Sequence, residues 1–251
     1  LTRTYITKFG CSFISMPNDR SSHFKPTPNG GGICFAIISS LYSLFLGNNF
    51  LLLCLPLSII GFIDDYINLR PLIRYIFQFL TVMSLLLFSG WLNLFFEKFS
   101  SLAIMFFIIL ILIIASTAVI NFVNFMDGID GLVASCMSII FLTVCLKGGQ
   151  NYLPILGTLI GFLILNWNPA KVFMGDSGST FLGALYLSII FKANFFIESL
   201  KYFLLLTPLI ADSVSTLFRR LVAKQNIFVA HKKHLYQRLF QSGLSHKKVS
   251  L

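Results

Sequence analysis

Long stretches without a charged residue alternate with short polar segments along most of this chain. A helix needs roughly 17–25 mostly apolar residues to cross the hydrocarbon core of a bilayer. The uncharged stretches therefore predict about eight membrane-spanning helices, whose ends extend into the neighbouring polar segments. The predicted spans lie near residues 32–47, 50–63, 72–89, 102–122, 131–146, 152–167, 178–191 and 200–217.

The composition also favours an all-α integral membrane protein. Of the 251 residues, 56% are apolar and 11% are charged, and the mean hydropathy is +0.84. Soluble domains average about 25% charged residues. The net charge of +10 predicts no nucleic-acid partner, because the enrichment of Lys and Arg in cytoplasmic loops explains most of it. The five cysteines have no metal-ligand spacing and imply no disulfide framework.

The distribution of Lys and Arg gives the expected orientation. With eight spans, both termini and every second loop share one side, which holds fifteen of the nineteen basic residues. That side is predicted to be cytoplasmic. The chain is then one polytopic membrane domain, residues 1–251. A cytoplasmic loop over 1–31 leads into transmembrane helices over 32–217, and a basic cytoplasmic segment follows over 218–251.

Every aspartate falls on the predicted cytoplasmic side. They are Asp19, Asp64, Asp65, Asp127, Asp130, Asp176 and Asp212. Carboxylates are costly in a membrane, so several of them at one depth are a functional signal. Like charges held close together also require a cation, a proton or a basic partner. The pattern predicts an enzyme whose active site opens to the cytoplasm.

The doublet Asp64-Asp65 ends the second predicted span. Carboxylates at a helix C-terminus oppose the helix dipole, so helix stability does not explain them. Binding of a cation or catalytic proton transfer would, with ordinary interfacial polarity as the alternative. Arg74 follows closely and could neutralise these acids or hold a phosphate.

Four polar residues recur at every third position from the end of the fourth span onward: Asn121, Asn124, Asp127 and Asp130. On a straight α-helix they would spread over half the circumference. Gly128 and Gly131 are predicted to break the helix near Asp127, and the break would direct both aspartates into one pocket.

Further candidates lie in the other polar segments. Asp176 and Ser177 are predicted at a helix N-terminus, where they could bind phosphate or cap the helix. Phe173 could stack on a base or pack in the membrane. Asp212 could form an ion pair with Arg74, Arg219 or Arg220, or take part in function. His231 and His234 can face one way and, with the lysines between them, bind phosphate or anionic lipid.

Together these residues favour metal-assisted phosphoryl transfer at a membrane surface. Mg²⁺ typically uses one or two protein carboxylates and substrate phosphates, which leaves other acids for proton transfer. One substrate would be a lipid phosphate and the other a soluble phosphate donor.

The motifs resemble those of the polyprenyl-phosphate N-acetylhexosamine-1-phosphate transferases, glycosyltransferase family 4. The strongest carriers of the resemblance are Asp64-Asp65, 124–132 and 173–179. The resemblance implies that a UDP-N-acetylated amino sugar and polyprenyl (undecaprenyl) phosphate give a polyprenyl-diphosphate sugar and UMP. It implies a requirement for Mg²⁺, with Mn²⁺ as a possible substitute, and a location in the bacterial inner membrane.

The resemblance also implies residue roles. Asp176 is implied as a metal ligand together with Asp127, and Asp64 and Asp65 as the pair that deprotonates the lipid phosphate or assists metal binding. Asn124, Asp127 and Asp130 are implied at the nucleotide-sugar and metal site, and the implied catalytic residues are Asp64, Asp65, Asp127 and Asp130. The residues implied to bind substrate are Lys25, Asn121, Asn124, Asn166, Phe173, Arg74, His231 and His234.

Two departures from the family pattern refine these expectations. The segment His231-Lys232-Lys233-His234 replaces the run of three histidines and an acid found in the muramoyl-pentapeptide branch. In this respect the chain is similar to the branch of the family that initiates O-antigen or other surface polysaccharides. The first family helix and the last one or two are expected to be missing. The remaining alternatives are a truncated inactive member of the family and a cation-coupled transporter. A homodimer is a further expectation.

Overall fold

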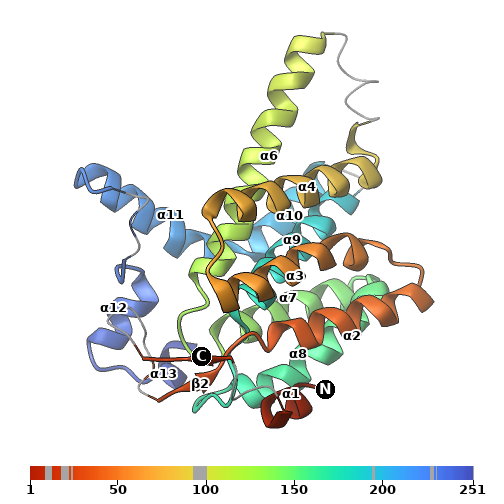
Figure 1. Ribbon diagram of the computed structural model, residues 1–251. Helices are drawn as coiled ribbons and strands as arrows, with labels where there is room; N and C mark the ends of the chain where they lie inside the picture. Colours follow the sequence, from red (N-terminus) through yellow and green to blue (C-terminus); the bar gives the residue numbers. More distant parts are fainter. Residues whose placement is uncertain are drawn as a thin grey trace.

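The structure, a computed structural model, describes residues 1–8, 13–17, 23, 25–92, 101–193, 196–226, 229 and 231–250 (Figure 1). Asp19 lies outside these ranges. The helices are α1 (Thr2–Lys8), α2 (Gly32–Phe45), α3 (Phe50–Ile67), α4 (Pro71–Ser89), α6 (Leu102–Phe125), α7 (Leu132–Leu146), α8 (Leu153–Asn166), α9 (Gly175–Lys192), α10 (Phe196–Leu205), α11 (Thr207–Val222), α12 (Leu235–Gln241) and α13 (His246–Ser250). A 3-10 helix, Gln150–Tyr152, precedes α8.

A small antiparallel ribbon interrupts this helical fold. Its strands are β1 (Ile14–Ser15) and β2 (Thr27–Pro28), and Ile14 pairs with Pro28. The Pro- and Gly-rich residues 25–31, within the predicted loop before the first span, form no helix. Proline lacks the amide that a helix interior needs, and glycine loses more backbone entropy than other residues on ordering.

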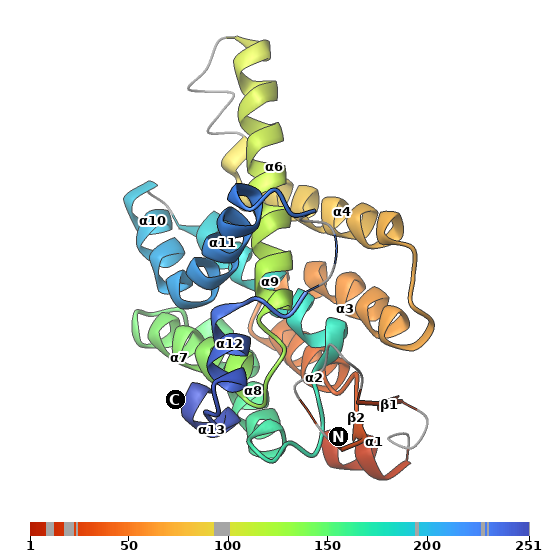
Figure 2. The ribbon, with the colours of Figure 1, turned by 90° about the vertical axis from the view of Figure 1, so that its left-hand side faces the viewer.

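Helix α9 is the centre of the bundle. Its residues 177–191 are all buried, and it packs against α2, α3, α4, α6 and α10 (Figures 1 and 2). The N-terminal half of α6, in contrast, extends beyond the other helices (Figure 2). The burial of α9 fixes its first turn, which carries Asp176, in the middle of the polar end of the bundle.

The close approach of α3 to α9 requires a glycine. A Cβ atom added at Gly61 would lie 2.5 Å from the carbonyl oxygen of Asp176 and 2.7 Å from the amide nitrogen of Ser177. Real side chains do not tolerate such contacts, so only glycine permits this packing. The approach brings the Asp64-Asp65 doublet, one turn further along α3, next to the start of α9.

Seven predicted spans each coincide with one helix: α2, α3, α4, α6, α7, α8 and α9. Within the described ranges, three helices are long and apolar enough to cross a membrane, namely α3, α4 and α6. The count becomes four if the bent pair α10–α11 forms one span. The fold is that of a helical membrane protein, whereas eight crossings stay a prediction.

The eighth predicted span, 200–217, differs from a single helix. Residues Ile197–Leu205 and Thr207–Val222 meet at 76°. Pro208 lies in the first turn of α11, where its missing amide costs nothing, but it cannot continue the hydrogen bonding of a preceding helix. The chain therefore turns at Leu206.

Alanine substitutions at Gly61 and at Gly157 should have opposite effects on protein stability, because only Gly61 is in close contact with another helix. Gly61→Ala should lower the stability of the detergent-solubilised protein by about 1–3 kcal/mol, because the new methyl group overlaps the backbone of α9. Gly157→Ala on α8 is the matched control, since nothing lies within 4 Å of its added Cβ. Alanine is about 1 kcal/mol better than glycine within a helix, so the control should raise the melting temperature. Equal melting temperatures for the two variants would contradict the packing described.

Candidate active site

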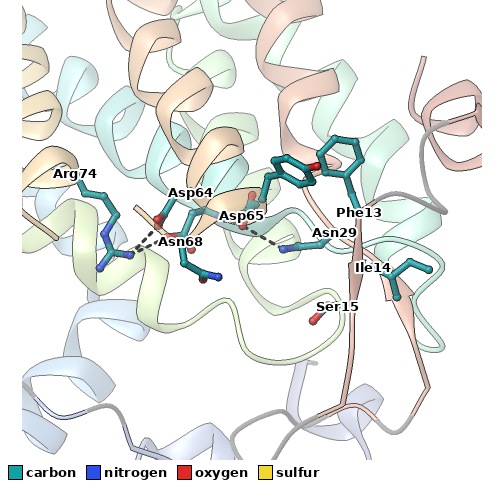
Figure 3. A pocket seen from close by; sticks show the side chains of 10 residues that line it. Phe13, Ile14, Ser15, Asn29, Asp64, Asp65, Asn68 and Arg74 are labelled. Atoms are coloured by element: carbon teal, nitrogen blue, oxygen red, sulfur yellow. Dashed lines mark hydrogen bonds and ion pairs between the residues drawn. The ribbon is translucent and has the colours of Figure 1, made fainter. Parts of the chain in front are cut away.

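The main cavity lies at the polar end of the bundle and has a volume of about 510 Å³. The β-ribbon, α3, α4 and the start of α9 surround it (Figure 3). Its lining residues are Phe13, Ile14, Ser15, Asn29, Asp64, Asp65, Tyr66, Asn68, Arg74 and Asp176. Four of the predicted site residues, Asp64, Asp65, Arg74 and Asp176, thus share one cavity.

Arg74 bridges two of these carboxylates. Its Nη1 atom lies 2.9 Å from Asp64 Oδ2 and 3.3 Å from Asp176 Oδ2. The second oxygen of Asp64 accepts the Leu69 amide at 2.6 Å. Of the two roles considered for Arg74, the ion pair is observed with Asp64 of the doublet, and phosphate binding stays a prediction. The guanidinium ties α4 to α3 and α9, and its side chain remains 39% exposed, so it can also contact a ligand in the cavity.

Asp65 caps α9 from a different helix. Its carboxylate accepts the amides of Asp176 at 2.9 Å and Ser177 at 3.2 Å, and Asn29 donates to it at 3.1 Å (Figure 3). The predicted helix start at Asp176 is confirmed. The expected cap by Asp176 or Ser177 is replaced by Asp65, and the Ser177 hydroxyl donates to Met174 O. Asp65 thus occupies the position where a phosphate was expected to meet the helix dipole.

The aspartate loop, residues 126–131, separates α6 from α7. The predicted helix break is confirmed, and Gly131 adopts a left-handed φ of 75° there. Asp130 accepts Asn168 Nδ2 at 2.8 Å and the Ala170 amide at 3.1 Å. Its other oxygen lies 3.2 Å from His246 Nδ1. Asp130 therefore joins three separate segments of the chain.

The two aspartates of this loop differ in their electrostatics. Burial would raise the pKa of Asp130, but hydrogen bonds from His246 and from the 168–170 segment outweigh it and lower the pKa. Burial raises the pKa of the Asp127 carboxyl well above its usual range. Three neighbouring carboxylates raise it further: Asp176, Asp65 and Asp130. Asp127 does not line the main cavity, but it is repelled by two carboxylates that do, those of Asp65 and Asp176.

Asn121 and Asn124 lie on the α6 face towards α4 and α9. Asn121 exchanges two amide hydrogen bonds with Gln78, at 2.9 and 3.2 Å. Asn124 accepts the Ser179 hydroxyl at 2.6 Å. Both asparagines line a second, small pocket that shares Arg74 and Asp176 with the main cavity. The two asparagines therefore lie on the same face of α6.

Three of the residues implied to bind substrate, Asn166, Phe173 and Lys25, lie outside the lining of the main cavity. Asn166 is buried and joins two loops, because it accepts the Gly131 amide at 3.1 Å and donates to Val172 O at 2.9 Å. Phe173 makes an edge contact with the His23 ring, with centroids 4.9 Å apart. Lys25 is exposed. None of the three lines the main cavity, and Asn166 instead holds the aspartate loop through Gly131.

The predicted histidine pair also lies apart from the main cavity. The rings of His231 and His234 stack with centroids 5.0 Å apart, which confirms that they face one way. His234 Nδ1 lies 3.4 Å from Asp212 Oδ1. Burial and the charge of Arg220 lower the pKa of His231 to about 4, so this ring is neutral near pH 7.

Among the described residues, Asp212 contacts His234 and the backbone of α12, and it forms none of the arginine pairs considered from the sequence. Besides His234, its carboxylate accepts the amides of Leu235 at 2.7 Å and Tyr236 at 3.1 Å. It therefore binds the start of α12. A cavity of about 210 Å³ lies beside it. Its lining is rich in cations: Thr216, Arg219, Arg220, Ala223, Gln225, Lys233 and Arg238.

The donor set suits a cation that completes its coordination with ligand oxygens. Among the described residues, no three His, Cys, Asp or Glu side chains form a ready metal site. Asp64, Asp65 and Asp176 nevertheless face one cavity with Arg74. Because Mg²⁺ usually takes one or two carboxylates and fills its sphere with phosphate oxygens and water, this set fits it.

Sequence reasoning missed three polar residues near these carboxylates. Asn29 contacts Asp65, Asn68 lines the cavity, and Gln78 pairs with Asn121. Asn68 has a left-handed φ of 50°, which asparagine tolerates better than most residues, so its place after the doublet was a usable signal. Gln78 lies one turn beyond Arg74, on the same helix face.

Comparisons with known proteins give a consistent family. A family model described as "Glycosyl transferase family 4" matches residues 48–194. The chain is 29% identical to the "Probable undecaprenyl-phosphate N-acetylglucosaminyl 1-phosphate transferase" of Bacillus subtilis (strain 168), covering 93% of this chain and 71% of the relative.

Two other relatives carry related names. The "Undecaprenyl-phosphate alpha-N-acetylglucosaminyl 1-phosphate transferase" of Thermotoga maritima is 32% identical over 89% of this chain and 72% of its own length. The "Phospho-N-acetylmuramoyl-pentapeptide-transferase" of Staphylococcus haemolyticus is 32% identical over 69% of this chain and 65% of its own length.

The cap made by Asp65 predicts an order of stability for two variants. Asp65→Ala removes the acceptor for two α9 amides, whereas Asp65→Asn keeps one acceptor oxygen at similar size. The alanine variant should therefore be less stable than the asparagine variant by about 1 kcal/mol. Thermal unfolding in detergent measures the difference. An alanine variant as stable as the asparagine variant would argue against the cap.

Proposed function

The chain belongs to glycosyl transferase family 4, and we propose that it transfers an N-acetylhexosamine 1-phosphate group from a UDP-sugar to polyprenyl phosphate. The printed names of its relatives support both substrates. The observation that carries the proposal is the bridge from Arg74 to Asp64 and Asp176, which faces a cavity of about 510 Å³.

The reaction is one phosphoryl transfer. An oxygen of the lipid phosphate attacks the β-phosphorus of the UDP-sugar and forms a new P–O bond. The bond from that phosphorus to the bridging oxygen breaks, and UMP leaves with the electron pair. The products are a polyprenyl-diphosphate sugar and UMP. Such a reaction depends on positioning and on neutralising the phosphates.

Arg74 is proposed to hold phosphate oxygens at the cavity. Its guanidinium is partly exposed and is fixed by two carboxylates, so little rotamer freedom remains to be lost on binding. Asp64 and Asp65 line the cavity beside it. Asp64 is engaged by Arg74 and Asp65 by α9, so we assign both chiefly to holding this arrangement.

We propose that Asp176 and Asp127 hold Mg²⁺, with Mn²⁺ as a substitute. When bound, the ion would neutralise the diphosphate and the departing UMP. Asp176 lines the cavity, and the raised pKa of Asp127 reflects carboxylates that a cation would stabilise. A nearby positive ion lowers such a pKa again.

The proposed function also includes an orientation in the membrane and a biosynthetic role. We propose one membrane domain with about eight crossings, both termini in the cytoplasm and the active site at the cytoplasmic face of the bacterial plasma membrane. The excess of Lys and Arg on that side supports this orientation. The histidine segment 231–234 supports a role in initiating surface polysaccharides, including O-antigen.

A defined assay tests the activity. Membranes containing the protein are incubated with undecaprenyl phosphate, Mg²⁺ and each of several UDP-N-acetylhexosamines. UMP should be released only when the lipid phosphate is present, EDTA should stop its release, and mass spectrometry should identify a polyprenyl-diphosphate sugar. Absence of this product with every UDP-sugar, despite folded protein, would refute the proposed function.

The bridge predicts a sharp difference between two neighbouring arginines. Arg74→Lys should lower kcat by roughly 100-fold, because lysine cannot hold two carboxylates and a phosphate in the same planar arrangement. Arg70→Lys is the matched control, since Arg70 is exposed and precedes α4. Its kcat should stay near that of the unaltered protein. Similar kcat values for both variants would exclude the role given to Arg74.

A further inference from the structure

We propose that His246 is a positioning residue for the transfer reaction, holding the aspartate loop through Asp130. The inference rests on the proposed function, because the loop also carries Asp127. The C-terminal segment, residues 231–250, forms α12 and α13 and lies against this loop and α7 (Figures 1 and 2).

Three contacts join the C-terminal segment to the loop region. His246 Nδ1 lies 3.2 Å from Asp130 Oδ1. The Ser250 hydroxyl donates to Asp130 O at 2.8 Å. The Tyr236 hydroxyl donates to Phe125 O, at the end of α6, at 3.0 Å. The loop is therefore held on the side where α12 and α13 pack, by groups more than a hundred residues away in sequence.

The His246–Asp130 contact is shielded from water. Each side chain is only 8% exposed, and the Phe240 ring packs edge-on against His246 at 4.5 Å. His246 Nδ1 also lies 3.4 Å from the Asp130 amide. In the tautomer with a proton on Nδ1, the ring donates to Oδ1, which is the closer contact, and in the other tautomer Nδ1 accepts from the Asp130 amide. A buried carboxylate requires such a donor.

The other hydrogen-bond partners of Asp130 connect the loop position that His246 sets to the rest of the active site. Asn168 and Ala170 donate to its second oxygen, so both oxygens of Asp130 are engaged by the protein. Asp130 thus acts through its neighbours, not by touching the reacting atoms. Asp127 is only three residues earlier, and a shift of Asp130 would move it relative to Asp65 and Asp176.

The C-terminal segment is also fixed at its other end. Asp212 accepts the first two amides of α12 and pairs with His234. Two buried aspartate–histidine pairs, one on α11 and one on the aspartate loop, therefore anchor the same segment. This explains why a short helix such as α13 can define the position of a loop.

The test uses three variants of the full chain, assayed for turnover and for hydrogen exchange without substrate. His246→Ala should raise amide exchange across residues 126–131 and lower kcat by about 10–100-fold, as losses of supporting hydrogen bonds around metal ligands do. His246→Asn should restore both within about threefold, because the asparagine Nδ2 can take the position of Nδ1. Lys247→Ala is the control on the exposed side of α13 and should change neither.

Unchanged exchange in His246→Ala, or a His246→Asn variant as impaired as His246→Ala, would overturn the proposal. If His246→Ala does not fold, His246→Asn and Ser250→Ala carry the test, and Ser250→Ala should raise exchange at the same loop. Normal exchange in Ser250→Ala would then count against the proposal. Hydrogen exchange of the loop is measured without substrate, so it tests the positioning role alone. Absence of turnover by the unaltered protein would instead count against the proposed function.

Discussion

Mutual repulsion among carboxylates is the constraint on which the polar end of this bundle depends. Several groups of the protein stabilise four of these aspartates. Arg74 contacts Asp64 and Asp176, the start of α9 binds Asp65, and His246 binds Asp130. Among the described residues, Asp127 has no such donor, and Asp176 shares its arginine. These two carboxylates are therefore the ones left for a cation, which is the physical basis for assigning the metal to them.

The local pattern of the sequence predicted much of this arrangement. The glycines after Met126 predicted the helix break, the apolar stretches predicted the helices, and the position of Arg74 after the doublet predicted its neutralising role. These features depend on residues close together in the chain, where helix periodicity and turn chemistry are informative. Pro208 was also visible, but the turn before it was not predicted.

The contacts that complete the site join residues far apart in sequence. Asp65 caps a helix that begins more than a hundred residues later, and Asp130 pairs with His246 near the end of the described chain. For Asp212 an arginine pair was one of two alternatives, and the carboxylate binds the start of α12 and His234. In a chain this apolar, almost every helix face is hydrophobic, so periodicity does not say which faces meet.

Two cavities among the described residues differ in charge: the main cavity is lined by aspartates with Arg74, and another is lined by Arg219, Arg220, Lys233 and Arg238. The main cavity joins the carboxylate proposed to bind a metal to the guanidinium proposed to bind phosphate. A cryo-EM structure with a UDP-N-acetylhexosamine and Mg²⁺ tests this most directly. The account predicts the diphosphate within hydrogen-bonding distance of Arg74, with metal density at Asp176. A diphosphate bound only in the cavity lined by Arg219 and Arg220, without contact to Arg74, would contradict the account.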